Sequence, residues 1–122
     1  MILADTSIWI DHLHRADPVL YRLFHSDGIL THPVVIGEVA LGRLVDRPGT
    51  LRILRKLPQA EVAGHEEVLQ LVEDWKLYGC GIGYGDAHLL ASVLLTSGTR
   101  LWTRDKKLRD VAKQLSLDAR LN

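Results

Sequence analysis

The chain begins with Ile2-Leu-Ala-Asp-Thr-Ser-Ile-Trp-Ile-Asp11, an apolar run that ends at an acid and passes directly into a second apolar run. The residues before Asp5 favour a short buried strand over Ile2–Ala4. Ser7 is a plausible N-cap for a helix that runs through Leu13. An acid at such a junction of strand and helix is oriented in advance by fixed backbone on both sides.

Three further acids stand beside apolar runs. Glu38 continues Pro33-Val-Val-Ile-Gly, Asp86 precedes Ala87-His-Leu-Leu-Ala, and Asp105 follows Arg100-Leu-Trp-Thr-Arg. We expect Glu38 to need a compensating partner, because a buried unpaired carboxylate is costly. Four carboxylates brought together by the fold would require a hard divalent cation between them. Taken singly, Asp86 and Asp105 could instead be ordinary helix N-caps.

Short apolar runs alternate with segments of helical spacing along the whole chain, which indicates an α/β fold with a parallel sheet. Beyond the first strand and helix, we expect strands at 29–31, 60–63, 100–103 and 118–121, and helices at 17–28, 33–44, 48–57, 66–78, 86–95 and 105–115. Ligands of open parallel sheets lie beyond the carboxyl ends of the strands. Asp5 and Asp105 fall at or just past such ends.

Size and composition place the chain among ordinary globular proteins. Its 122 residues suit one domain, and 47% hydrophobic with 25% charged residues is far from a disordered composition. The single cysteine, Cys80, cannot form an internal disulfide, and no secretory signal is evident. No apolar run approaches the ~20 residues that span a bilayer. We therefore expect a cytoplasmic protein.

The net charge of zero conceals an uneven distribution of basic residues. Residues 100–122 hold seven Lys or Arg against three Asp. A second basic group has Asp46 as the one acid in its span and comprises Arg43, Arg47, Arg52, Arg55 and Lys56. Both stretches could track a phosphate backbone or form a solvated helix face, and the sequence leaves the two interpretations open.

Two other patterns do not support a site. The glycines of Gly79-Cys-Gly-Ile-Gly-Tyr-Gly85 follow a helix and do not match G-x-G-x-x-G, which disfavours dinucleotide binding. His65-Glu-Glu-Val-Leu lacks the second histidine of a zincin helix, which disfavours zinc.

The four acids suit phosphodiester hydrolysis, in which Mg²⁺ or Mn²⁺ activates water and offsets phosphoryl charge. Mg²⁺ keeps several waters, so a few protein oxygens suffice to hold it. Asp5, at a strand end, and Asp86, at a helix start, are the best candidates for metal ligands, because fixed backbone on both sides would orient them in advance. Glu38 could reach the metal directly or through a water, and Asp105 completes the acidic ring. Three hydroxyls could orient a carboxylate or contact a substrate phosphate: Thr6, Ser7 and Thr103.

Four segments together resemble the motifs of PIN-domain ribonucleases, and within them the VapC-type toxins of toxin-antitoxin pairs. They are Ile2-Leu-Ala-Asp-Thr-Ser-Ile-Trp-Ile-Asp11, Val35-Ile-Gly-Glu38-Val-Ala-Leu-Gly42, Gly83-Tyr-Gly-Asp86-Ala-His-Leu-Leu-Ala-Ser92 and Leu101-Trp-Thr-Arg-Asp105-Lys-Lys-Leu108. Their order and spacing agree over nearly the whole chain. The resemblance implies a single PIN-like domain over residues 1–122, a three-layer α/β/α fold with a parallel sheet of about four to five strands.

The resemblance also implies an activity and a set of partners. The activity would be that of a Mg²⁺- or Mn²⁺-dependent endoribonuclease toxin acting on structured RNA such as tRNA or rRNA, with Asp5, Glu38, Asp86 and Asp105 as the acidic site. A VapB-type antitoxin would cover that site, its C-terminal segment lying in an apolar groove near Trp9, Leu13 and Leu44. The toxin would pair as a homodimer.

One residue departs from the family pattern. Arg104 stands where many relatives have a small polar residue, often Asn. A cation there could lower the pKa of Asp105 or touch phosphate. We favour the simpler interpretation, an exposed side chain that points away from the site.

Two other functions fit the same size and acidic pocket. A phosphoryl-accepting receiver domain usually has adjacent acids after its first strand and a late Lys-Pro, whereas Asp5 is followed by Thr-Ser; a haloacid-dehalogenase-type phosphatase fails at Ser7 for the same reason. A catalytically inactive PIN fold that only binds is disfavoured because all four acids are present. Metal-dependent RNA cleavage would separate these alternatives from the nuclease.

Overall fold

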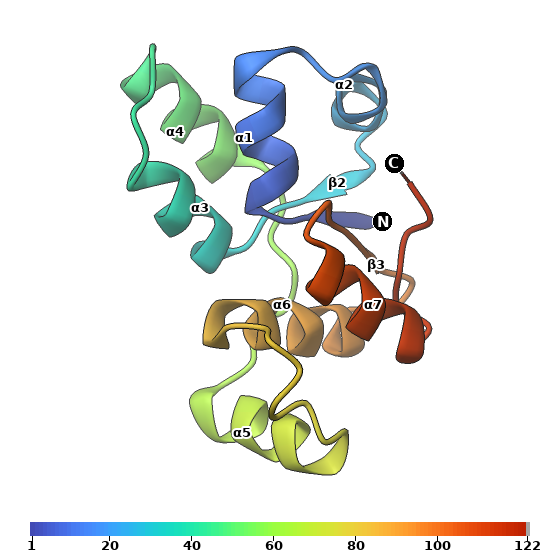
Figure 1. The fold of residues 1–122 in the computed structure, drawn as a ribbon. Coiled ribbons are helices and arrows are strands. Elements are labelled where there is room, and N and C mark those ends of the chain that lie inside the picture. The colour runs from blue at the N-terminus through green and yellow to red at the C-terminus, as the bar shows by residue number, and fades with distance from the viewer. Residues whose placement is uncertain (122) are drawn as a thin grey trace.

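The computed structural model describes residues 1–121, which form a three-stranded parallel sheet covered by helices (Figure 1). The strand order is β2-β1-β3, with β1 at Ile2–Ala4, β2 at Ile29–Leu30 and β3 at Arg100–Trp102. Ile2 is in register with Ile29 on one side and with Arg100 on the other. The carboxyl ends of all three strands therefore lie at one edge, the edge from which Asp5 emerges.

The sheet has fewer strands than the four to five expected. The segments at 60–63 and 118–121 run beside the sheet without forming strands. Gln59, just before the first segment, makes a single parallel bridge to Thr31, and Asp118 of the second makes one to Leu101. Pro33, which begins helix α3 (Pro33–Ala40) soon after β2, has no N–H to donate to the first segment. Arg120 has a φ of 60°, which interrupts the extended backbone of the second segment. Both predicted edge strands are wrong for these reasons.

Seven helices surround the sheet within the described residues: α1 (Thr6–His14), α2 (Pro18–His25), α3 (Pro33–Ala40), α4 (Arg47–Lys56), α5 (His65–Asp74), α6 (Tyr84–Leu95) and α7 (Lys106–Gln114). In Figure 1, α1 to α4 lie on one side of the sheet, and α6, with α5 beneath it, lies on the other. This is the expected layer order of helix, sheet and helix.

Several helices end earlier than the apolar spacing predicted. Helix α3 stops at Ala40 instead of Leu44, and α5 stops at Asp74 instead of Tyr78. Lys76 has a φ of 52°, a left-handed conformation that continues no helix. Trp75, the residue that caps the end of α5, is consequently 51% exposed.

The core joins the strands to α6. Leu3 and Leu101 of the sheet are fully buried, as are Leu89 and Leu90 of α6. Trp102 is 1% exposed and is among the largest fully buried side chains. Helix α6 is apolar on most faces and is largely buried. Its buried position fixes the start of α6, where Asp86 lies, against the centre of the molecule.

No helix within residues 1–121 is long and apolar enough to cross a membrane.

Candidate active site

Asp5 lies at the point where β1 passes into α1. Its carboxylate accepts a hydrogen bond from the backbone N–H of Ile8 at 3.3 Å, so Asp5, and not Ser7 as predicted, is the N-cap of α1. The Ser7 hydroxyl donates to Asp5 Oδ1 at 2.5 Å, and the Thr103 hydroxyl donates to Asp5 Oδ2. Asp5 is 5% exposed, and each of its oxygens is thus fixed by a hydroxyl from a different part of the chain.

The segment that follows β3 sets the direction of both hydroxyls. The backbone N–H of Arg104 donates to Ser7 Oγ at 3.1 Å, and that of Asp105 donates to Thr103 Oγ1 at 3.0 Å. A hydroxyl that accepts from an N–H on one side is free to direct its own proton to the other side. Both protons therefore go to Asp5.

Glu38 reaches the same region from α3. Its Oε1 accepts a hydrogen bond of 2.6 Å from the Thr6 hydroxyl, and its Oε2 lies 3.8 Å from where a side chain on Gly85 would begin. Glu38 thus lies beside the start of α6, although the atom nearest to such a side chain would be Val34 Cγ1, at 3.0 Å. Glu38 itself is exposed, which corrects our expectation of a buried carboxylate. Its position needs no compensation for burial.

Asp86 and Asp105 occupy the first turns of two helices. Asp86 is the third residue of α6, and its Oδ2 accepts from the N–H of Gly83 at 3.1 Å, the residue that caps the helix. Asp105 is the N-cap of α7 and accepts from the N–H of Leu108 at 3.0 Å. Each therefore has a structural role, but each uses one oxygen for it. The other oxygen of each accepts no hydrogen bond from residues 1–121.

Electrostatic coupling shows that the four acids share one region. Burial raises the pKa of Asp5, and the charge of Asp86 raises it further against the lowering effect of its hydrogen bonds. Burial also raises the pKa of Asp86, and the charges of Asp105 and Glu38 add to that increase. The fold therefore brings the four predicted acids together, along with the predicted hydroxyls of Thr6, Ser7 and Thr103, which bind two of these carboxylates.

The donor set fits a hard divalent cation that keeps much of its water. All candidate ligands are carboxylate oxygens, the type that Mg²⁺ and Mn²⁺ prefer. No group of three or more His, Cys, Asp or Glu side chains in the described part of the chain is arranged to hold a metal ion together. Mg²⁺ does not require three protein ligands, since one or two carboxylates and several waters hold it in many phosphoryl sites. A cation here would also relieve the mutual repulsion that raises the pKa of Asp86.

Arg104 is half-buried and makes two ion pairs, so our interpretation of it as an exposed side chain was wrong. Its Nη1 donates to Asp11 of α1 at 2.8 Å, and its Nη2 donates to Asp17, the N-cap of α2. The guanidinium also lies over the Trp102 ring, 5.6 Å from its centroid. Sequence reasoning missed this cluster because its partners are 93 and 87 residues away and no local spacing links them.

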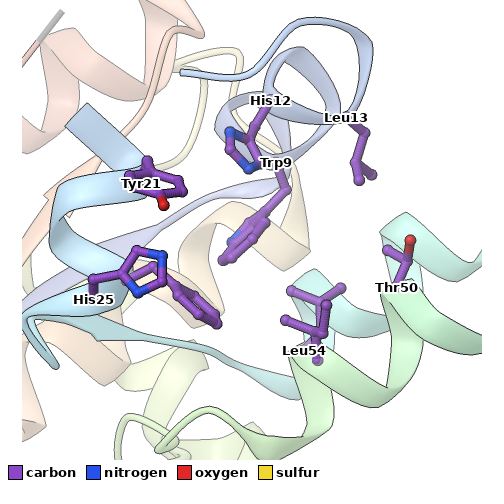
Figure 2. A pocket seen from close by; sticks show the side chains of 9 residues that line it. Trp9, His12, Leu13, Tyr21, His25, Thr50 and Leu54 are labelled. Carbon is purple, nitrogen blue, oxygen red and sulfur yellow. The ribbon is translucent and has the colours of Figure 1, made fainter. Parts of the chain in front are cut away.

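An apolar groove opens between α1, α2 and α4 (Figure 2). Its cavity of about 210 Å³ is lined by Trp9, His12, Leu13, Tyr21, Phe24, His25, Thr50, Ile53 and Leu54. Trp9 and Leu13 are residues expected near such a groove, but α4 side chains take the place predicted for Leu44. The indole N–H of Trp9 is buried and has no acceptor within residues 1–121.

Comparison with known proteins agrees with this fold. Residues 2–114 match the PIN domain, so the chain belongs to the PIN-domain family. The match includes all four acids. Within this family the chain is similar to "Ribonuclease VapC32" of two Mycobacterium tuberculosis strains, CDC 1551 / Oshkosh and ATCC 25618 / H37Rv. The identity to each is 50% over 109 residues, which are 89% of this chain and 88% of the relative.

Proposed function

We propose that this protein is a metal-dependent endoribonuclease and the toxin of a toxin-antitoxin pair. The observation that carries the proposal is the convergence of Asp5, Glu38, Asp86 and Asp105 at the carboxyl edge of the sheet. It is supported by 50% identity to proteins named Ribonuclease VapC32. PIN-domain ribonucleases generally depend on a divalent metal, and we propose Mg²⁺ or Mn²⁺ because every candidate ligand here is an oxygen.

The residues of the acidic site would have different roles in catalysis. Asp5 and Asp86 would hold the cation, which when bound supplies Lewis-acid stabilisation and a more acidic water. Ser7 and Thr103 keep the Asp5 carboxylate in one orientation. Glu38 has Oε1 fixed by Thr6, which leaves Oε2 to accept a proton from the attacking water. Asp105 would add negative charge that strengthens cation binding.

The proposed substrate is RNA, including structured RNA such as tRNA or rRNA. Exposed basic side chains at the start of α7, Lys106 and Lys107, stand next to Asp105 and could contact phosphates. A second exposed basic surface on α4 includes Arg52, Arg55 and Lys56. Phosphate contacts of this kind would make binding weaken as salt rises.

The proposed partner is a VapB-type antitoxin. We also propose that the toxin is cytoplasmic and that it forms a homodimer. The groove of Figure 2 suits an apolar helical segment, which aromatic and aliphatic walls would anchor. A basic residue of the antitoxin directed at the acids would then compete with metal for the same carboxylates.

Membership in the PIN family removes the receiver-domain and phosphatase alternatives. One experiment distinguishes the nuclease from the inactive binding module. Purified protein should cleave RNA with Mg²⁺ or Mn²⁺ and not with EDTA, and Asp86→Asn should remove cleavage while preserving the fold, because it deletes a charge but keeps the volume.

The matched control is Asp74→Asn on α5, whose carboxylate accepts a hydrogen bond from Gln70 that an amide oxygen can also accept. This variant should cleave normally. Undiminished cleavage by Asp86→Asn would overturn the site, and metal-independent or absent cleavage by the wild type would overturn the function.

A further inference from the structure

Arg104 connects the segment after β3 to two helices on the other side of the active site. Its guanidinium binds Asp11 in the middle of α1 and Asp17 at the start of α2. Its side chain is 27% exposed and lies against the ring of Trp102, which is itself buried. A planar guanidinium that spans two carboxylates and an aromatic ring has little freedom to move.

The backbone of the same residue belongs to the support of Asp5. The N–H of Arg104 binds Ser7 Oγ, and the next N–H along the chain binds Thr103 Oγ1. These are the hydroxyls that donate to the two oxygens of Asp5. A displacement of Arg104 would therefore disturb both hydroxyls together, and through them the direction of the Asp5 carboxylate.

We propose that Arg104 is a positioning residue for the RNA-cleaving site: its ion pairs with Asp11 and Asp17 fix the 103–105 segment that orients Asp5. The effect on RNA cleavage rests on the proposed function, whereas the role of the ion pairs in fixing the 103–105 segment does not. The guanidinium works by holding backbone in place, and it touches no reacting atom.

A direct contact of Arg104 with substrate phosphate is the competing explanation. The geometry disfavours it because both terminal nitrogens already donate to carboxylates. Those two acids hold the pKa of the guanidinium above its usual value through hydrogen bonds, chiefly that with Asp11. The same pairing opposes the burial of Asp17 and holds the pKa of that carboxyl below its usual value. Each partner thus stabilises the charge of the other.

The two explanations predict different kinetics. Arg104→Met keeps an aliphatic stem but removes the ion pairs, so positioning predicts a fall in kcat of about 10- to 100-fold, the size that a misplaced catalytic group produces. KM for RNA should change by less than about threefold, because ground-state binding is unaffected. Arg104→Lys should retain only part of the activity, because the ammonium keeps the positive charge but cannot contact both carboxylates as the guanidinium does. The control, Arg22→Met, removes an exposed arginine of α2 and should match the wild type.

Variation of the partners provides the decisive test. Asp11→Ala with Asp17→Ser leaves Arg104 in place but removes both of its carboxylate partners, and Ser still caps α2. Positioning predicts that this double variant loses kcat as Arg104→Met does, and that adding Arg104→Met to it causes little further loss. A substrate contact predicts the reverse: the released guanidinium would bind RNA at least as well, and Arg104→Met would mainly raise KM. That result would overturn the proposal.

Amide hydrogen exchange gives a readout that needs no activity. In Arg104→Met and in the double variant, the N–H groups of residues 104 and 105 should exchange faster, while those of β1 keep wild-type protection. Unchanged exchange at both amides would overturn the positioning role even if activity falls. If exchange changes as expected but the wild type cleaves no RNA, the positioning role stands and the proposed function fails.

Discussion

Thr103→Val removes one hydroxyl from beneath Asp5 and keeps nearly the same shape. Thr103 is 1% exposed, and its hydroxyl donates to Asp5 Oδ2 and accepts from the N–H of Asp105. Asp5 is 5% exposed, so water cannot readily replace the lost donor. The substitution therefore leaves a buried carboxylate oxygen with one partner fewer.

The size of the effect follows from the charge of the acceptor. A hydrogen bond to an ionised group contributes about 1.5–3 kcal/mol, and one to a neutral group about 0.5–1.5 kcal/mol. The variant should thus lose about 1.5–3 kcal/mol of unfolding free energy when Asp5 is ionised. The loss should shrink by about 1 kcal/mol when Asp5 is protonated, because the neutral acid needs the donor less.

The pH dependence has a definite sign. Burial already raises the pKa of Asp5 in the folded protein, and the Thr103 hydrogen bond is one of the contacts that lower it. Removing that contact raises the pKa further, so the folded variant binds protons more tightly than the folded wild type. The destabilisation should be smallest below the raised pKa of Asp5 and should grow as pH rises through it.

Urea denaturation in EDTA at a series of pH values measures this difference. The matched control is Thr96→Val, whose hydroxyl also accepts from one N–H, that of Glu61, but donates to a carbonyl of Ser92. Its loss should not vary with pH. A loss for Thr103→Val that is equally independent of pH, or below about 0.5 kcal/mol throughout, would refute the argument that this hydroxyl stabilises an ionised Asp5.

Three further outcomes are expected. Mg²⁺ or Mn²⁺ at 100 times its Kd should stabilise the wild type by about 2.7 kcal/mol, while the Asp5→Asn, Asp86→Asn double variant should melt higher than the wild type in EDTA and gain less from metal; equal gains would place the metal elsewhere. Metal-free wild type should lose stability as pH rises through the raised pKa values of Asp5 and Asp86. The melting temperature of the double variant should depend less on pH over the same range. Leu13→Glu in the groove should weaken antitoxin binding in calorimetry and spare RNA cleavage, and a similar weakening by Leu69→Glu on α5 would argue against the groove.

Local patterns in the sequence predicted much of the fold. The run before Asp5 predicted β1 with its bounds, and the helix predicted from position 17 matches the cap and start of α2. Caps and strand periodicity are properties of a few neighbouring residues. Helix ends were less predictable: α3 and α5 stop while apolar spacing continues. The prediction of two edge strands was wrong for a related reason, because a strand forms only where a partner strand pairs with it, and the partner lies far away in the sequence.

The sequence by itself determined which chemistry the chain can carry, since four acids in family order are a property of the chain alone. Only the tertiary structure decided how that chemistry is held. Ser7 looked like a cap and Arg104 like a surface residue, yet one fixes Asp5 and the other anchors the segment that fixes Ser7. These contacts join residues nearly a hundred positions apart, and such pairings follow from β1 and β3 lying side by side, which no local preference specifies.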